Sequence, residues 1–164
     1  MLDFVKIYSD GSARGNPNGP GGFGTILEYT DKAGNLHTRE YSAGFVRTTN
    51  NRMELMAVIQ GLECIRWRPA VVHVVSDSSY VVKAYNENWI LKWRRTGFAK
   101  VKNPDLWMRL DALVQSMSVT FHWVKGHAGH PENERCDAMA VAAGAGAVAA
   151  GVILPADPGY VPEQ

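Results

Sequence analysis

The 164-residue chain is 46% hydrophobic and 20% charged, and it carries a formal net charge of +1. These values exclude a disordered or fibrous protein and fit one globular domain with a buried core. Cys64 and Cys136 are far apart and form no CxxC pair, which argues against a disulfide framework and agrees with a reducing compartment. The first residues lack the pattern of a secretory signal, so we expect a cytoplasmic protein.

The first part of the chain predicts three strands. Residues 4–9, 23–29 and 36–45 read as strands, separated by a segment rich in Gly and Pro and by a turn around residues 31–35. Because consecutive strands with short connections pair side by side, we expect an antiparallel meander.

The rest of the chain alternates helical and strand patterns. Apolar residues recur at every third position between 53 and 65, which predicts a helix over residues 51–66. Further helices are expected to begin at residues 78, 88, 104 and 131, and short apolar strands are expected at 71–75 and 119–124. We therefore predict an α/β fold with a five-stranded mixed sheet, an antiparallel meander plus parallel crossover strands, flanked by helices.

The end of the chain predicts a tail rather than a second domain. Residues 138–156 are uncharged but rich in Ala and Gly, and Pro155 interrupts them, so we do not expect them to span a membrane. The expected organisation is one domain over residues 1–145 and a flexible tail over residues 146–164.

Four carboxylates stand at or beside the ends of predicted strands and helices: Asp10, Glu54, Asp77 and Asp137. Asp10 and Asp77 follow two strands that are expected to be parallel neighbours, and open α/β sheets place their sites at that end. Taken singly, each acid also fits a helix cap or a solvated surface position. Clustered acids repel one another unless a hard divalent cation such as Mg²⁺ lies among them, and such sites cut phosphodiesters.

Two further groups of residues surround these acids in the sequence. Glu134 shares a helix face with Asp137, and His127 lies in the preceding loop, where a histidine suits proton transfer. Between residues 83 and 102, basic residues interleave with tryptophans, a pattern that suits nucleic-acid backbones and bases; its members include Trp89, Lys92, Trp93, Arg94 and Arg95. The alternative is that the tryptophans pack in the core and the basic residues form a solvated face.

Four segments carry a resemblance to a known family. YSDGSARGNPNGPGG, TTNNRMELMA, SDSSYV and WVKGHAGHPENERCDAMA, between residues 3 and 143, resemble ribonuclease HI, the bacterial type 1 ribonuclease H. The resemblance implies a metal-dependent endonuclease that hydrolyses the RNA strand of RNA–DNA hybrids, giving 5′-phosphate and 3′-hydroxyl ends with little sequence specificity. It also implies Mg²⁺ as cofactor, with Mn²⁺ as a substitute and up to two ions per site.

The resemblance also assigns roles to residues. Asp10, Glu54, Asp77 and Asp137 match its metal-binding carboxylates, His127 matches a loop histidine that assists proton transfer or product release, and Glu134 matches an acid flanking the metals. The positions that match hybrid contacts are Asn16, Asn50, Asn51, Thr49 in a pocket for a DNA phosphate, and residues 89–102, the basic handle that grips the DNA strand.

Two positions depart from the family pattern. Ser79 stands where relatives commonly have a Gln that contacts RNA, and Lys92 stands where an Asn would complete the phosphate pocket; Lys can hold a phosphate as a point charge. The handle is also shorter between residues 98 and 103.

Two alternative functions remain open, a resolvase-like nuclease of the same fold and a non-catalytic hybrid-binding module. We expect a monomer.

Overall fold

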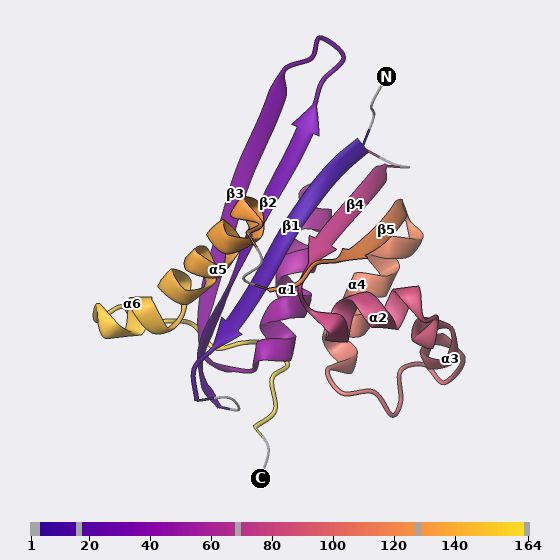
Figure 1. Cartoon of the computed structure of the whole chain (residues 1–164). Helices are drawn as coiled ribbons and strands as arrows, with labels where there is room; N and C mark the ends of the chain where they lie inside the picture. Colours follow the sequence, from indigo (N-terminus) through magenta and orange to yellow (C-terminus); the bar gives the residue numbers. More distant parts are fainter. Residues whose placement is uncertain (1–3, 16–17, 68–69, 127–128, 163–164) are drawn as a thin grey trace.

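The computed structural model describes residues 4–15, 18–67, 70–126 and 129–162 (Figure 1). Five strands form one mixed sheet in the order β3-β2-β1-β4-β5, in which β1 pairs antiparallel with β2 and β2 with β3, while β4 runs parallel to β1 and to β5. The strands are β1 (Phe4–Ala13), β2 (Gly19–Thr30), β3 (Leu36–Thr48), β4 (Val71–Ser76) and β5 (Ser118–Trp123). This architecture confirms the fold predicted from the sequence.

Helices cover both faces of the sheet. In Figure 1, α5 lies on one face, across β1 and β2, and α1, α2 and α4 lie on the other. The helices are α1 (Asn50–Glu63), α2 (Ser79–Asn86), α3 (Trp89–Arg95), α4 (Pro104–Gln115), α5 (Pro131–Ala143) and α6 (Ala145–Ala149). Thr49 and Ser78 begin α1 and α2 by accepting hydrogen bonds from backbone N–H groups in the first turn, as helix caps do.

The larger core lies between the sheet and the layer of α1, α2 and α4. Ile7 and Val74 from the central strands and Leu55 from α1 are fully buried there, and so is Trp107 from α4. Burying an aliphatic side chain of this size contributes about 1.5–3 kcal/mol, so this layer holds α1 firmly against β1.

On the opposite face, α5 approaches the sheet closely because glycines line its path. A Cβ atom added to Gly24 would lie 2.3 Å from the backbone oxygen of Cys136, and one added to Gly44 would lie 1.9 Å from that of Ala143. Both distances are far below contact, so the backbone of α5 occupies the space that side chains on β2 and β3 would need. This packing fixes the helix that carries Asp137.

The last part of the chain differs from the flexible tail expected for residues 146–164. A short helix, α6, follows α5, and residues 155–160 pack against the start of α1, where Asp157 is buried. The polar and Pro-rich sequence predicted an extended segment, but ion pairing with a residue far away in the chain holds it in place. Within the described residues, no helix is long and apolar enough to cross a membrane.

Candidate active site

The parallel register of β1 and β4 brings Asp10 and Asp77 to the same end of the sheet. Ser9 pairs with Ser76, so the next residue of each segment is an acid. β4 ends there, whereas β1 continues to Ala13 and carries Asp10 past the neighbouring strand. The side chains of both acids therefore face the crevice beyond β4, the position that open α/β sheets use for ligands.

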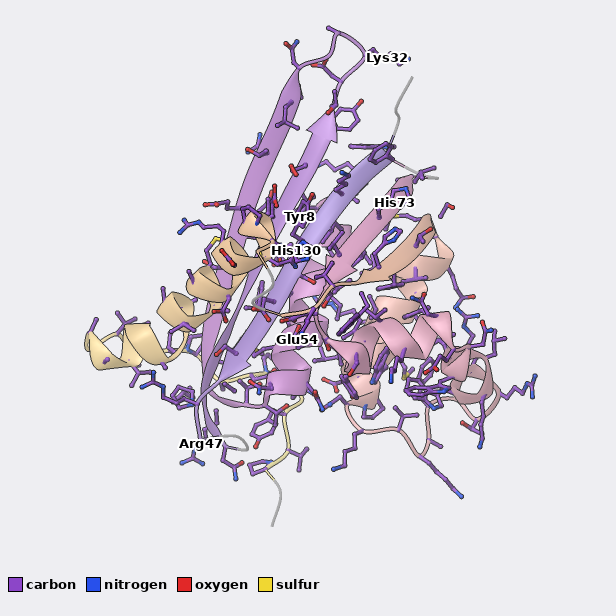
Figure 2. All side chains as sticks on the ribbon, in the orientation of Figure 1. Tyr8, Lys32, Arg47, Glu54, His73 and His130 are labelled. Atoms are coloured by element: carbon purple, nitrogen blue, oxygen red, sulfur yellow. The ribbon has the colours of Figure 1, made fainter. Side chains whose placement is uncertain are left out.

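Glu54 joins this pair from α1, because Gly11 lets the helix pack directly on β1. A Cβ atom at residue 11 would lie 2.4 Å from the backbone nitrogen of Glu54, so only glycine permits this approach. Figure 2 shows Glu54 on α1 beside β1 and the end of β4. One carboxylate oxygen from each of Asp10, Glu54 and Asp77 lies within 4.8 Å of the other two.

The first turns of α5 close the site from the other side. Asp137 and Glu134 line a small recess together with Asp10 and Asp77, and the recess holds a free volume of about 10 Å³. A space of this size is about enough for one water molecule or ion. The structure thus brings together all four carboxylates identified in the sequence, with Glu134 beside them.

Burial and mutual repulsion disfavour the ionised state of these acids. Burial, followed by the charges of Asp77 and Asp137, raises the pKa of Asp10 to about 7, although a hydrogen bond with Glu54 opposes the rise. The pKa of Glu54 is raised as well, first by burial and then by the charge of Asp10. Without a cation the pair therefore retains a proton near neutral pH.

One buried carboxylate oxygen at this site has no hydrogen-bond partner among the described residues. Glu54 Oε2 accepts no hydrogen bond among the described residues, although it is buried and a buried carboxylate oxygen normally has a partner. Convergent carboxylate oxygens with an unused lone pair are the donor set that hard divalent cations such as Mg²⁺ and Mn²⁺ prefer. The site fits a divalent cation on these grounds.

Several predicted substrate contacts lie at the start of α1, in the same chain segment as Glu54. Thr49 caps the helix, Asn50 accepts a hydrogen bond from Ala13 N through Oδ1 at 2.6 Å, and Asn51 is exposed. Ser79 is exposed at the start of α2. Asn16 and His127 lie outside the described residues.

The predicted handle divides into packing and exposed residues. Trp93 packs edge-on against the buried Trp107, with ring centroids 5.0 Å apart, and Arg94 donates to the buried Asp111 carboxylate at 2.7 and 2.8 Å. Trp89, Lys92 and Arg95 are exposed around them; they are the members of the set that face solvent. The sequence left two interpretations of these residues open, contact with a nucleic acid and packing in the core, and the packing interpretation is correct for Trp93 and Arg94.

Sequence reasoning missed Asn133, which lines the recess of the acids. Its Nδ2 donates to the backbone oxygen of Val75 at 3.1 Å, and this bond ties α5 to β4. Its Oδ1 is buried and without a partner among the described residues. The available signal was its spacing of four from Asp137, which puts the two on one helix face.

Comparison with known proteins agrees with this geometry. The sequence profile of the RNase H family matches residues 3–145. A protein named Ribonuclease H from Lachnoclostridium phytofermentans is 58% identical over 147 residues, covering 87% of this chain and 92% of that protein. A Ribonuclease H from Escherichia coli O127:H6 is 49% identical over 148 residues, covering 87% and 90%.

Solved structures agree as well. LC9-RNase H1, described as a type 1 RNase H with the type 2 active-site motif, gives a TM-score of 0.76 at 32% identity and covers 89% of this chain and 74% of its own. The N-terminal RNase H domain of a Mycobacterium tuberculosis protein, solved as a fusion with maltose-binding protein, gives 0.67 at 28% identity, covering 92% and 100%. With its acidic site at the end of a five-stranded mixed sheet, the chain belongs to the ribonuclease H family, in the bacterial type 1 branch.

Proposed function

We propose that the protein is an endoribonuclease that hydrolyses the RNA strand of RNA–DNA hybrids, leaving 5′-phosphate and 3′-hydroxyl ends. The observation that carries the proposal is the convergence of Asp10, Glu54 and Asp77 within 4.8 Å at the sheet end, in a chain whose family match spans residues 3–145. Residues 1–145 then form the catalytic domain.

The four carboxylates are proposed to hold Mg²⁺, with Mn²⁺ as a substitute and up to two ions at the site. When bound, such ions stabilise charge on the scissile phosphate and the leaving oxygen and lower the pKa of the attacking water. The fold holds these four ligands in place on β1, on α1, just after the end of β4 and on α5. Glu134 adds negative charge beside them.

The pair Asp10 and Glu54, and separately His127, are proposed to bind and release protons at the site. Asp10 and Glu54, which share a hydrogen bond, release their proton as a cation binds, so cation affinity rises with pH. His127, which follows β5 and precedes α5 in the chain, is proposed to assist proton transfer or product release, since an imidazole titrates near neutral pH.

Substrate selection is proposed to come from contacts to both strands. Asn16, Asn50 and Asn51 carry amides suited to the 2′-hydroxyls that an RNA strand displays in its minor groove, and Ser79 adds a hydroxyl. Thr49 and Lys92 are proposed to hold a DNA phosphate.

The exposed part of α3 supplies the remaining contacts, with Trp89 and Arg95 against the DNA strand and Trp93 and Arg94 supporting them from the packed side. Since most of these groups contact sugar and phosphate, binding is expected to be weakly sequence-dependent and to fall steeply with salt. We further propose a cytoplasmic monomer.

The test uses one labelled sequence as RNA–DNA hybrid, RNA–RNA duplex and DNA–DNA duplex, each in Mg²⁺ and in EDTA. The proposal predicts cutting of the RNA strand of the hybrid in Mg²⁺ alone, with 5′-phosphate on the downstream fragment. Cutting of the DNA duplex would favour a resolvase-like nuclease. Hybrid binding without cutting would identify a binding module.

A further inference from the structure

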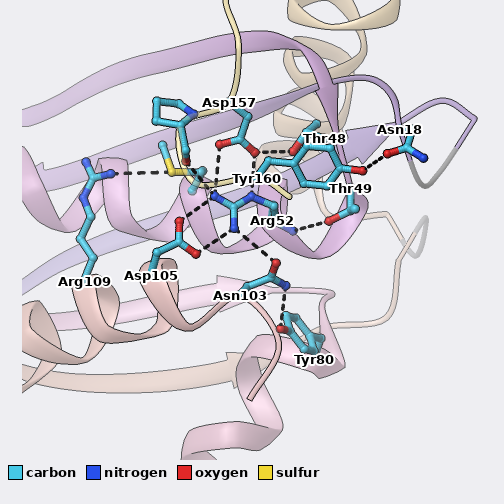
Figure 3. Close-up of polar contacts among 12 residues, drawn as sticks. Asn18, Thr48, Thr49, Arg52, Tyr80, Asn103, Asp105, Arg109, Asp157 and Tyr160 are labelled. Atoms are coloured by element: carbon cyan, nitrogen blue, oxygen red, sulfur yellow. Dashed lines mark hydrogen bonds and ion pairs between the residues drawn. The ribbon is translucent and has the colours of Figure 1, made fainter. Parts of the chain in front are cut away.

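Residues 155–160, here called the terminal strap, cross the sheet end beside the start of α1 (Figure 3). The strap begins at Pro155, whose backbone oxygen accepts a hydrogen bond from Val46 N in β3 at 2.9 Å. It ends at Tyr160, whose hydroxyl donates to Oδ1 of Asn18, the residue immediately before β2. The strap therefore contacts two elements that are distant from it in the chain.

The centre of the strap is an ion pair that excludes water. Arg52 Nε donates to Asp157 Oδ2 at 2.7 Å, and the side chains of both residues are only 2% exposed. Thr48 Oγ1 donates to the same oxygen at 2.7 Å. Because a buried charge needs a fully satisfied partner, this pair fixes the strap with a geometry that surface ion pairs do not reach.

Arg52 also connects the strap to the start of α1 and to α4. Its guanidinium also binds the Asp105 carboxylate from α4 through two hydrogen bonds of 2.8 and 2.9 Å, so it lies between two acids. Its backbone N–H donates to Thr49 Oγ1 at 3.2 Å and completes the helix cap. One residue therefore connects the strap, α4 and the turn that presents Thr49 and Asn51.

The strap also forms part of the wall of a cavity at this turn. The cavity has a volume of about 370 Å³, and its lining includes Thr49, Asn51 and Lys102 together with Gly159 and Tyr160 of the strap. Gly159 has φ +84°, and a Cβ atom there would lie 2.3 Å from Asp105 Oδ2. The strap thus packs closely against Asp105 at the start of α4.

We infer that the terminal strap is a positioning element for hybrid binding, in which Asp157 acts through Arg52 on the Thr49–Asn51 turn and Tyr160 holds the end of the strap against Asn18. The inference rests on the proposed function, because it takes that turn as a hybrid contact. No strap residue lines the recess of the four acids, so the strap sets affinity for the substrate and leaves the chemical step alone.

The test compares four forms of the full-length protein: wild type, Asp157→Asn, Tyr160→Phe and a control lacking only residues 162–164. Each is assayed for KM and kcat on an RNA–DNA hybrid in Mg²⁺, at a temperature where circular dichroism shows every form fully folded. For Asp157→Asn and Tyr160→Phe, KM is expected to rise about three- to tenfold, the range for one lost hydrogen bond, with kcat within about twofold. The control is expected to match wild type.

A purely structural role predicts a different pattern. If Asp157→Asn lowers the melting temperature but leaves KM unchanged once the protein is folded, the strap stabilises the fold only and the inference is wrong. A loss confined to kcat would also contradict it. Tyr160→Phe removes a single hydroxyl from a half-buried residue, so it keeps the test decisive even where Asp157→Asn folds poorly.

A double-mutant cycle tests the proposed route. If Asp157 acts through the Thr49–Asn51 turn, then Asp157→Asn changes KM less in an Asn51→Ala background than in wild type, since coupled residues are not additive. Full additivity would contradict the route. Failure of the wild type to cleave hybrids would overturn the proposed function itself, whereas normal cleavage with unchanged variants would overturn only the role of the strap.

Discussion

Replacing Asp10 by asparagine is expected to stabilise the metal-free protein, although it removes a proposed cation ligand. Burial, with the charges of Asp77 and Asp137, raises the pKa of Asp10 from 3.8 to about 7. The unfolded chain releases the proton near pH 4, whereas the folded chain holds it until about pH 7. Folding is therefore progressively disfavoured as the pH rises from 4 to 7, and the full cost applies above that.

The size of the effect follows from this difference of about three pKa units, which corresponds to about 4 kcal/mol above pH 7 and to less than half of that at pH 5. An asparagine carries no charge, but it still occupies the recess and changes the hydrogen bond with Glu54. We therefore expect Asp10→Asn to raise the free energy of unfolding by about 2 kcal/mol at pH 8, roughly half of the full value, and by much less at pH 5.

The assay is urea unfolding in EDTA at pH 5 and pH 8, followed by circular dichroism. Asp31→Asn is a control of opposite sign, because hydrogen bonding to His37 lowers the pKa of Asp31 to about 2; this variant must not stabilise the protein. The same gain for Asp10→Asn at both pH values, or none at pH 8, would refute the electrostatic reasoning. Saturating Mg²⁺ should stabilise the wild type at pH 8 and so reduce the difference in the free energy of unfolding between the wild type and Asp10→Asn.

Further predictions concern the packing and the exposed surface. Asp111→Ala leaves the Arg94 guanidinium without its buried partner, so the free energy of unfolding is expected to fall by about 3 kcal/mol in urea titrations; an unchanged midpoint would contradict this. Arg95→Ala is expected to change stability by less than about 0.5 kcal/mol but to weaken hybrid binding measured by fluorescence anisotropy, and equal affinity would remove Arg95 from the interface. Gly24→Ala places a methyl group against α5 and is expected to cost about 2 kcal/mol or more; a melting temperature equal to that of wild type would contradict the close packing. Burial, then His73, lowers the pKa of His122, so the folded state disfavours protonation; wild type should lose more stability than His122→Asn between pH 7.5 and pH 5.5, and parallel melting curves would exclude this contribution.

The order and type of the main elements could be predicted because local patterns agree with the fold. The nearly continuous apolar run at residues 71–75 marked the strand β4, and the threefold spacing of residues 53–65 marked α1. The strap could not be predicted in this way. Asp157 is anchored by Arg52, 105 residues away in the sequence, and no local pattern signals a partner at that separation.

The acidic site was predictable for a similar reason. Asp10 and Asp77 each follow a strand, and parallel neighbours bring such positions together without reference to side-chain detail. The handle was not resolved by sequence, because Arg94 and Arg95 are adjacent and chemically identical. Only the orientation of α3 against α4 decides that Arg94 reaches the buried Asp111 while Arg95 stays exposed.

The converging carboxylates are proposed to form the catalytic centre for hybrid cleavage. The most direct measurement is kcat on a saturating RNA–DNA hybrid in Mg²⁺ for Asp10→Asn, Glu54→Gln and Asp77→Asn, with Asp31→Asn in the distant β2–β3 turn as control. Each of the three is expected to lose about a thousandfold or more, while the control keeps wild-type turnover. Turnover within about tenfold of wild type in folded Asp10→Asn and Glu54→Gln would contradict the account, because the buried acids would then not hold the reacting centre.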